Sequence, residues 1–228
     1  MATRPVFVPD IDPGNPQLVH EQEVDFQWVP DRSAQGKKQN IAKLHAAAGH
    51  RKLEPLLEVS LASSDPLRAH ICAANLAVED DKSFLVPLLA AYHGSKVFAK
   101  GGPFADLYRK PISVITGDER LTQSGKQIGF RFMGLEWGVK AETLFYDWLV
   151  LHAIHRYRRV RAGIGRFVGF TEIDCRPGEK TVCHARSCAF FAALAAKNLL
   201  DEVVDSQDRF IEVMLRDPFY QIADRRTR

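Results

Sequence analysis

The residues with the clearest chemical potential lie in the segment AYHGSKVFAKGGPFADLY, residues 91–108, where Lys96 stands among apolar and aromatic neighbours. Burial disfavours the charged form of a lysine, lowers its pKa and frees the neutral amine to act as a nucleophile that forms a Schiff base. The alternative is a surface lysine whose stem covers apolar neighbours while its amine stays in water. Gly101 and Gly102, followed by Pro103, form either a plain link or the N-terminus of a short helix whose open amides hold phosphate.

Two carboxylates and an arginine make a second set of candidates. Glu172 and Asp174, in the segment FTEID at residues 170–174, would share one face of a strand, and one of them could serve acid–base chemistry. The alternative for either residue is ordinary solvation of a surface carboxylate, which is the more common situation. Arg186 and Ser187 stand where a buried helix is predicted to begin, so they either cap that helix or direct its amide end toward an anion.

Cysteine and histidine side chains provide a third set of reactive groups. Cys175, Cys183, His184 and Cys188 have the chemical types of metal ligands, but their spacing matches no compact zinc module. The sequence also lacks a G-x-G-x-x-G, a Walker loop, a G-x-S-x-G and a C-x-x-C motif, so it supports none of the common cofactor folds. We therefore predict no metal and no cofactor, with these cysteines and Cys72 present as reduced thiols.

An arginine-rich stretch, HRYRRVRAGIGR at residues 155–166, carries the densest local positive charge. The net charge of the whole chain is +3, which does not by itself indicate a nucleic-acid-binding protein. Such a stretch is commonly a solvated helix end, where cations interact favourably with the macrodipole. The alternative is contact with DNA phosphates, for which the candidates are Arg156, Arg158, Arg159 and Arg161.

The hydrophobic pattern predicts the elements that must position these residues. Apolar residues recur at helical spacing after position 143 and indicate an amphipathic helix that carries the arginine-rich stretch at its far end. Residues 185–200 have almost no charge and indicate a helix buried nearly all round. Further helices are predicted at 37–50, at about 87–100 and after Pro103, and strands at 23–29, at 56–60 and within 166–183.

Composition bounds the class of protein. The 228 residues are 46% hydrophobic and 26% charged, which is ordinary for a globular domain with one core. There is no apolar run of signal-peptide length at the N-terminus, and no segment approaches the ~20 apolar residues of a membrane helix. We therefore expect a cytoplasmic protein without a membrane partner, folded as a mainly α-helical α+β domain with a small N-terminal β element.

Several stretches of the chain resemble the NADAR family, and specifically the branch found beside DarT-type toxins that ADP-ribosylate guanine in DNA. They follow one another in the family's order across most of the sequence. The matching stretches are RPVFVP at 4–9, FQWVP at 26–30, LLEVS at 56–60, YHGSKVFAKGGPFADLY at 92–108, DERLTQSGKQIGF at 118–130, LFYDWL at 144–149, FTEID at 170–174 and CHARSCAFF at 183–191.

This resemblance implies a YbiA-like single domain, with 1–22 as an N-terminal arm, 23–220 as the NADAR-like domain and 221–228 as a frayed tail. It implies an antitoxin that removes ADP-ribose from guanine bases in DNA, with Lys96 in its active site and without metal or cofactor. The implied partners are ADP-ribosylated DNA, ADP-ribose and a neighbouring DarT-type toxin. The residues assigned to the ligand pocket are Asn75, Gly101, Gly102, Asp106, Tyr146, Trp148 and Arg186.

The chain departs from the family pattern at position 89. A glutamate commonly stands seven residues before the motif lysine and a glutamine three before it, whereas this sequence has Leu89 and His93. Cleavage of a C1–N bond through an oxocarbenium-like transition state needs negative charge or proton transfer nearby. We expect His93, Glu172 or Asp174 to supply it. The alternative is an antitoxin without catalysis that binds ADP-ribose or modified nucleotides, or sequesters a partner toxin.

Overall fold

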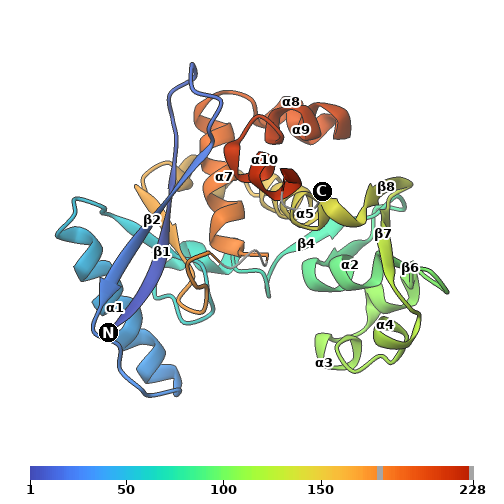
Figure 1. The fold of residues 1–228 in the computed structure, drawn as a ribbon, viewed down its shortest axis with the longest axis horizontal. Helices are drawn as coiled ribbons and strands as arrows, with labels where there is room; N and C mark the ends of the chain where they lie inside the picture. Colours follow the sequence, from blue (N-terminus) through green and yellow to red (C-terminus); the bar gives the residue numbers. More distant parts are fainter. Residues whose placement is uncertain (179–181, 226–228) are drawn as a thin grey trace.

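The computed structural model describes residues 1–178 and 182–225, and it confirms an α+β fold in which helices outweigh strands (Figure 1). Within these residues, no helix combines the length and the apolar character needed to cross a membrane. The strands are β1 (Ala2–Pro9), β2 (Val19–Phe26), β3 (Leu56–Glu58), β4 (Ala77–Glu79), β5 (Leu85–Pro87), β6 (Lys96–Phe98), β7 (Gln127–Phe132), β8 (Leu135–Gly138) and β9 (Gly169–Thr171). The α-helices are α1 (Ala34–Gly49), α2 (Leu88–Gly94), α3 (Ile112–Ile115), α4 (Arg120–Gln123), α5 (Glu142–His155), α6 (Arg158–Ile164), α7 (His184–Ala196), α8 (Leu200–Asp205), α9 (Gln207–Met214) and α10 (Pro218–Arg225), and the 3₁₀ helices are η1 (Pro66–His70), η2 (Ala105–Arg109) and η3 (Val139–Ala141).

The main sheet has the strand order β2-β1-β9-β3. Strands β1 and β2 form an antiparallel hairpin, while β9 pairs antiparallel with β1 and parallel with β3. Successive side chains of β1 point to opposite faces, so Val6 packs in a cluster with α1 and Phe7 packs in the larger core with α7. The two helices therefore cover the two faces of this sheet.

The N-terminal hairpin is more extensive than the sequence indicated. The predicted strand at 23–29 begins earlier, at Val19, and ends at Phe26, and its partner β1 lies within the residues 1–22 that were expected to form an arm. Both faces of β1 are covered, so Val6 and Phe7 are both buried. A strand covered on both faces shows no alternation of apolar and polar residues, which is the signal that identified β2.

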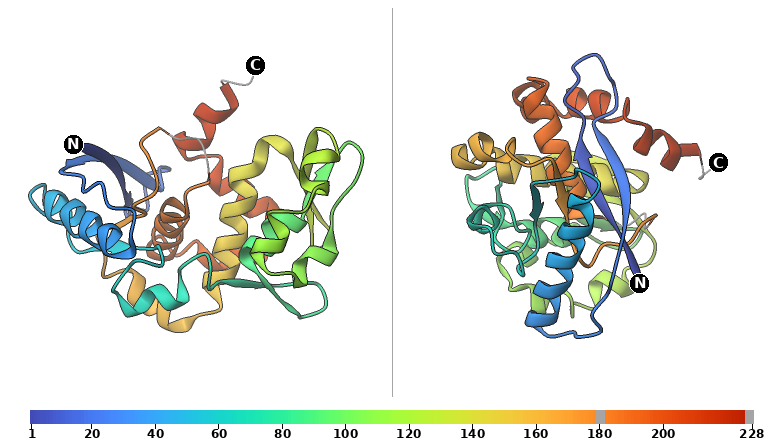
Figure 2. Two further views of the ribbon diagram at one scale, coloured as in Figure 1. Left: turned by 90° about the horizontal axis from the view of Figure 1, so that it is seen from below. Right: turned by 90° about the vertical axis from the view of Figure 1, so that its left-hand side faces the viewer.

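Helices α5 and α7 form the centre of the molecule, between the β1–β2 layer and the sheet of β6, β7 and β8 (Figures 1 and 2). Every residue of α5 from Leu144 to Ile154 except His152 is buried, so this helix is covered all round and the predicted amphipathic helix is wrong in that respect. Its buried Asp147 accepts hydrogen bonds from the hydroxyls of Ser187 in α7 and Tyr220 in α10. Burial nevertheless raises the pKa of Asp147 to about 6.

The segment around Lys96 folds differently from its prediction. The helix expected at 87–100 ends at Gly94, and Lys96 begins strand β6, which pairs antiparallel with β7 opposite Phe130. A side chain at Gly94 would place its Cβ 2.6 Å from the ring of Tyr108, so that ring closes over the helix end. The predicted helix after Pro103 is the short 3₁₀ helix η2. The pairing of Lys96 with a distant strand determines the conformation of this segment, and local periodicity in the sequence carries no information about such pairing.

Two further elements end earlier than predicted. Helix α5 stops at His155, so most of the arginine-rich stretch lies on a separate helix, α6. Strand β9 stops at Thr171, so Glu172 and Asp174 follow the strand and do not share one of its faces. The predicted helix at 37–50 and the strand at 56–60 are confirmed by α1 and β3, and the helix at 185–200 is confirmed by α7, which ends at Ala196.

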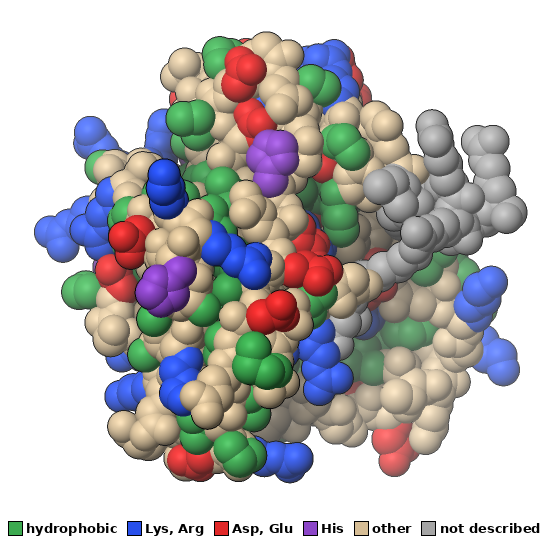
Figure 3. All heavy atoms as spheres, turned by 60° about the vertical axis from the view of Figure 1, so that its left-hand side comes forward, with side chains coloured by type: hydrophobic (Ala, Val, Ile, Leu, Met, Phe, Trp, Pro, Cys, Tyr) green, Lys and Arg blue, Asp and Glu red, His purple; other side chains and the backbone are tan. Residues whose placement is uncertain are grey.

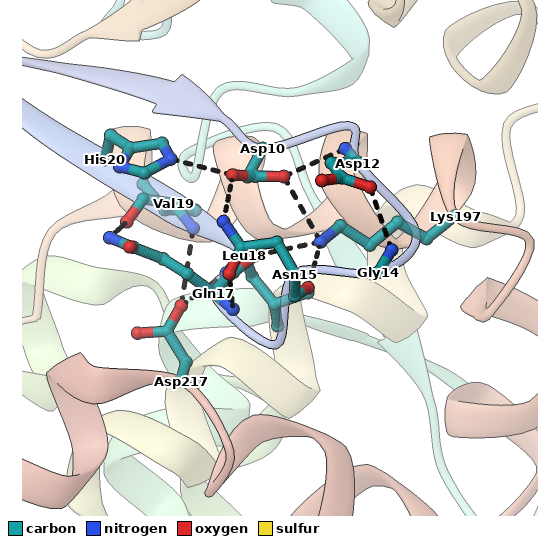
Figure 4. A network of polar contacts seen from close by, with 10 residues as sticks. All are labelled: Asp10, Asp12, Gly14, Asn15, Gln17, Leu18, Val19, His20, Lys197 and Asp217. Carbon is teal, nitrogen blue, oxygen red and sulfur yellow. Dashed lines mark hydrogen bonds and ion pairs between the residues drawn. The ribbon is translucent and has the colours of Figure 1, made fainter.

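A buried polar network fastens the loop between β1 and β2 to the end of α7 (Figure 4). The Lys197 side chain, 2% exposed, donates hydrogen bonds to the carbonyls of Asn15 (2.6 Å) and Gln17 (2.9 Å). Its Nζ lies 3.4 Å from Asp10 Oδ1, and the other oxygen of Asp10 contacts His20 Nε2 at 2.8 Å. One buried cation therefore neutralises a carboxylate and satisfies two carbonyls of a distant loop.

Replacing Lys197 with methionine should lower the free energy of unfolding by about 3 kcal/mol, because Asp10 and two loop carbonyls lose a buried cationic partner. Guanidinium denaturation followed by circular dichroism measures this change. Lys110→Met, at an exposed lysine, is the matched control and should leave the midpoint nearly unchanged. Equal midpoints for Lys197→Met and the wild type would contradict the anchoring role.

Candidate functional site

Lys96 lies at the start of β6 with its amine beside an aromatic ring. The Nζ atom is 4.9 Å from the centroid of the Tyr92 ring, which belongs to the preceding helix α2. Lys96 is half-buried, and burial lowers its pKa, while the negative charge of Glu142 acts in the opposite direction. The neutral amine is therefore easier to form than at an exposed lysine, which agrees with the first of the two interpretations of Lys96 that the sequence left open.

Glu142 is a member of this group that sequence reasoning missed. It lies in the first turn of α5 and accepts a hydrogen bond from the Tyr92 hydroxyl. Its negative charge acts to raise the pKa values of both Lys96 and His93, against the lowering caused by burial. Fifty residues separate Tyr92 from Glu142, and an acidic residue in the first turn of a helix is commonplace, so the chain offered no local signal.

His93 adjoins the same group. Its ring centroid lies 5.1 Å from that of Tyr92, and the side chain is half-buried. Burial lowers the pKa of His93, the positive charge of Lys96 lowers it further, and Glu142 opposes both. Lys96, His93 and Glu142 thus combine an amine, an imidazole and a carboxylate around one tyrosine. Leu89, on the same helix, is half-buried and brings no charge.

The two glycines of the motif support the backbone of Lys96. Gly102 has a φ of +91°, and a Cβ there would stand 2.3 Å from the carbonyl oxygen of Lys96. The amide of Gly101 donates to the Phe98 carbonyl at 3.3 Å, and Phe98 N–H donates back to Gly101 at 2.7 Å. The Gly101 amide is therefore engaged within the turn, whereas the sequence had suggested open amides at a helix N-terminus.

A chain of buried contacts links this group to Glu172. The ring of Tyr146 in α5 meets that of Tyr92 edge to face at 5.4 Å, and its hydroxyl lies 3.2 Å from His184 Nδ1. His184 Nε2 contacts the Ile71 carbonyl, which only accepts, so Nε2 carries the proton and Nδ1 accepts from Tyr146. Burial lowers the pKa of His184 to about 4, which keeps this ring neutral.

The carboxylate of Glu172 lies at the N-terminus of α7, beside the backbone amides of its first turn. Its Oε2 accepts a hydrogen bond from the His184 N–H at 3.0 Å. Burial raises the pKa of Glu172, although the His184 and Ala185 amides oppose this shift. A carboxyl group with a raised pKa holds its proton closer to neutral pH and is suited to act as a general acid.

A second buried carboxylate, Glu58 of β3, supports the segment that carries Glu172. It accepts hydrogen bonds from the Thr171 hydroxyl (2.8 Å) and the Ile173 amide (3.0 Å), the residues on either side of Glu172. Thr171 Oγ1 in turn lies 2.9 Å from His45 Nε2 of α1. Burial raises the pKa of Glu58 to about 7. The sequence gave no indication of this residue, because it lies within an apolar strand.

The other residues predicted for the site have different surroundings. Trp148 is 3% exposed and packs against Trp137 and His152, so we assign it to the core. The Tyr146 ring is also buried, which leaves no open face on which a base could stack. The remaining predicted residues have partners other than Lys96. Arg186 lies between the rings of Phe7 and Phe219 and reaches Glu21. Asp174 pairs with Lys37 at 2.6 Å, Asp106 pairs with Arg120 at 2.8 Å, and Asn75 is exposed in a turn before β4.

The arginines proposed to contact DNA differ in their pairing. Arg156 lies 3.7 Å from Glu79 and Arg161 lies 3.2 Å from Asp201, so carboxylates partly neutralise both. Arg158 and Arg159 are exposed on α6 and make no ion pair with any residue that the structure describes. Elsewhere, cationic and acidic side chains are interspersed on the face shown in Figure 3 and do not form one basic patch.

The prediction of four reduced thiols is wrong for one pair. Cys175 and Cys183 form a disulfide, whereas Cys72 and Cys188 are free and buried. The eight-residue separation of the pair gave no indication of bonding, because the turn after β9 is what returns the chain toward α7. Both sulfur atoms lie beside Glu172.

A groove of about 510 Å³ lies between η2 and the segment that leads into β5. The predicted pocket residue Asp106 is among its lining residues, but Lys96, His93 and Glu142 are not. The groove and the lysine-centred group are therefore separate features. The residues that line the groove are Asp80, Asp81, Lys82, Phe84, Leu85, Val86, Ala105, Asp106, Tyr108 and Arg109.

The fold and the site together define an α+β protein with a lysine–carboxylate centre of the kind used for nucleophilic or acid–base chemistry. The chain belongs to the family described as DarT1-associated NADAR antitoxin, whose model matches residues 2–223. This confirms the resemblance carried by the sequence motifs and relates the chain to DarT1 toxins. No curated protein matches the chain.

The buried carboxyl of Glu58 should make stability depend on pH. Its folded-state pKa is raised from 4.5 to about 7, so the folded protein binds this proton more tightly than the unfolded chain does. The resulting stabilisation is complete below about pH 4.5 and is lost as the pH rises through 7. Relative to Glu58→Gln, the wild type should therefore lose about 3 kcal/mol between pH 4.5 and 8, measured by denaturation at each pH. Glu54→Gln, at an exposed glutamate, is the control, and a wild-type-to-Glu58→Gln difference that stays constant with pH would contradict the assignment.

Proposed function

We propose that this antitoxin is an ADP-ribosyl glycohydrolase that removes ADP-ribose from guanine bases in DNA. The observation that carries the proposal is the half-buried Lys96 amine, which lies 4.9 Å from the centroid of the Tyr92 ring. Burial lowers its pKa, and the negative charge of Glu142 acts to raise it. The description of the family, an antitoxin associated with DarT1, agrees with a role in reversing toxin chemistry. Glu142 also provides a carboxylate near Lys96 in a chain that has Leu89 where the family commonly has glutamate.

In the proposed reaction, the neutral Lys96 amine attacks C1 of the ribose as the C1–N bond to guanine breaks. An acid gives a proton to the leaving base, and the ring of the resulting glycosylamine opens to a protonated imine. Water adds to that imine, which releases ADP-ribose and restores the amine. His93 and Glu142 are suited to the proton transfers by their position beside Lys96, whereas Glu172 meets the lysine-centred group only through His184 and Tyr146.

DNA would be held by exposed cations outside the lysine-centred group. Arg158 and Arg159 are better suited to this contact than Arg156 and Arg161, because acidic partners among the described residues already neutralise the latter two. Each phosphate contacted by an arginine makes binding more sensitive to salt. These contacts would contribute to the affinity for DNA and would take no part in the cleavage reaction.

Single-stranded DNA that carries ADP-ribosyl-guanine should release free ADP-ribose when incubated with the protein, as followed by mass spectrometry. Lys96→Ala should abolish release, and Glu142→Gln should slow it by about 10²–10⁴-fold if it removes an acid–base group. Lys100→Ala and Glu23→Gln, at exposed positions, are the matched controls and should keep wild-type rates.

Absence of release by a folded protein that still binds ADP-ribose would overturn the glycohydrolase proposal. The sequestration alternative would then gain support from a stable complex with a DarT1-type toxin that Lys96→Ala leaves intact. Normal turnover by Glu142→Gln would remove Glu142 from the mechanism without affecting the assignment of Lys96.

The imine makes a separate prediction. Sodium borohydride added during turnover should reduce it to a stable amine, and mass spectrometry should then find ADP-ribose attached at Lys96. The adduct should be absent from Lys96→Arg, because the guanidinium cannot act as the nucleophile at neutral pH. Release of ADP-ribose without any trapped adduct would indicate hydrolysis by an activated water instead.

A further inference from the structure

The Cys175–Cys183 disulfide and a carboxylate meet where the segment after β9 approaches the start of α7. Cys175 Sγ and Cys183 Sγ lie 3.3 and 3.8 Å from Oε2 of Glu172. The ligand atoms of all three residues lie within 4.8 Å of one another. We propose that, when the disulfide is reduced, these three side chains bind one Zn²⁺ ion.

The ligand geometry suits this ion. With Zn–S distances of about 2.3 Å and Zn–O distances of about 2.1 Å, a tetrahedral site places each sulfur about 3.6 Å from the oxygen. The two observed sulfur-to-oxygen distances, 3.3 and 3.8 Å, bracket that value. Only the two sulfur atoms must separate, to about 3.8 Å, which reduction of their bond permits. Thiolate and carboxylate are both established ligands of zinc.

The electrostatic surroundings favour the same assignment. Two thiolates and one carboxylate carry three negative charges, so a bound Zn²⁺ leaves the site with one negative charge. Cys183 is the N-cap residue of α7, and the N-terminus of a helix favours negative charge. The amide of His184 holds Glu172 Oε2 at 3.0 Å and orients the carboxylate, as outer partners do in metal sites.

Access to the site is also adequate. Cys175 and Glu172 are only partly buried, so solvent can supply the ion and occupy the fourth coordination position. The sequence did not reveal the site, because neither the separation of the two cysteines nor the position of Glu172 resembles a compact zinc module. The fold brings the ligands together. The metal site uses Glu172, which the proton transfers by His93 and Glu142 do not require, so metal binding is independent of the glycohydrolase proposal.

Oxidation and metal binding exclude each other at this site. Oxidised glutathione converts the two thiols to the disulfide and is itself reduced to two molecules of glutathione, so protons and electrons balance. The same two sulfur atoms cannot then bind zinc as thiolates. The oxidised protein therefore serves as an internal control for the reduced one.

The test is titration of the phosphine-reduced, metal-free protein with ZnSO₄ in competition with a chromophoric chelator. One ion should bind per chain. Cys175→Ser and Cys183→Ser should lose this binding, and Glu172→Gln should bind about tenfold more weakly or worse. Cys72→Ser removes a free, buried cysteine and is the matched control. Co²⁺ should give a thiolate charge-transfer absorption band that disappears after treatment with oxidised glutathione.

A measurement on the unaltered chain guards against variants that fail to fold. Zinc should protect Cys175 and Cys183 of the reduced protein from alkylation, as mapped by mass spectrometry. Binding of equal strength by oxidised and reduced protein, or alkylation of both cysteines unaffected by zinc, would overturn the proposal. A reduced protein of native circular dichroism that binds no zinc would overturn it equally.

Discussion

The hydrogen bond between Tyr146 and His184 is the interaction on which the site depends most. It joins α5 to α7 in the centre of the core, and the neutral imidazole is fixed at both nitrogens. Helix α5 carries Glu142 one turn before Tyr146, while the amide end of α7 holds Glu172. A rotation of either helix would therefore move a carboxylate away from its partners. The spacing between the lysine-centred group and Glu172 follows from how these two helices pack.

Buried carboxyl groups recur around that packing. Glu58, Asp147 and Glu172 all have pKa values raised by burial, and each accepts hydrogen bonds from donors on other elements. Glu58 and Asp147 are almost fully enclosed and fix the positions of a strand end and of three helices. Glu172 differs because it is only half-buried, so a ligand could reach it. Burial thus makes Glu58 and Asp147 structural residues, whereas Glu172 combines a raised pKa with the exposure that chemistry needs.

Elements with strong local patterns could be predicted from the sequence, and those defined by distant pairing could not. The uncharged run of α7 and the spacing in α1 identified both helices, and the proximity of Lys96 and His93 follows from their nearness in the chain. By contrast, Lys96 belongs to a strand because β7 pairs with it, and Glu142 joins the site because α5 packs against α2. Trp148 and Arg186 have the residue types of ligand contacts, but the core surrounds both. Residue type indicated the chemistry, whereas burial decided which residues are available for it.

The anchoring of the β1–β2 loop by Lys197 has a consequence for synthesis. The hairpin leaves the ribosome well before Lys197, because the cation that satisfies the carbonyls of Asn15 and Gln17 lies some 180 residues further along the chain. Until that residue emerges, Asp10 and the loop carbonyls have only water and their neighbours as partners. The loop between β1 and β2 can therefore take its final form only after Lys197 has been synthesised and α7 has folded, which ties the order of an early segment to a residue made much later.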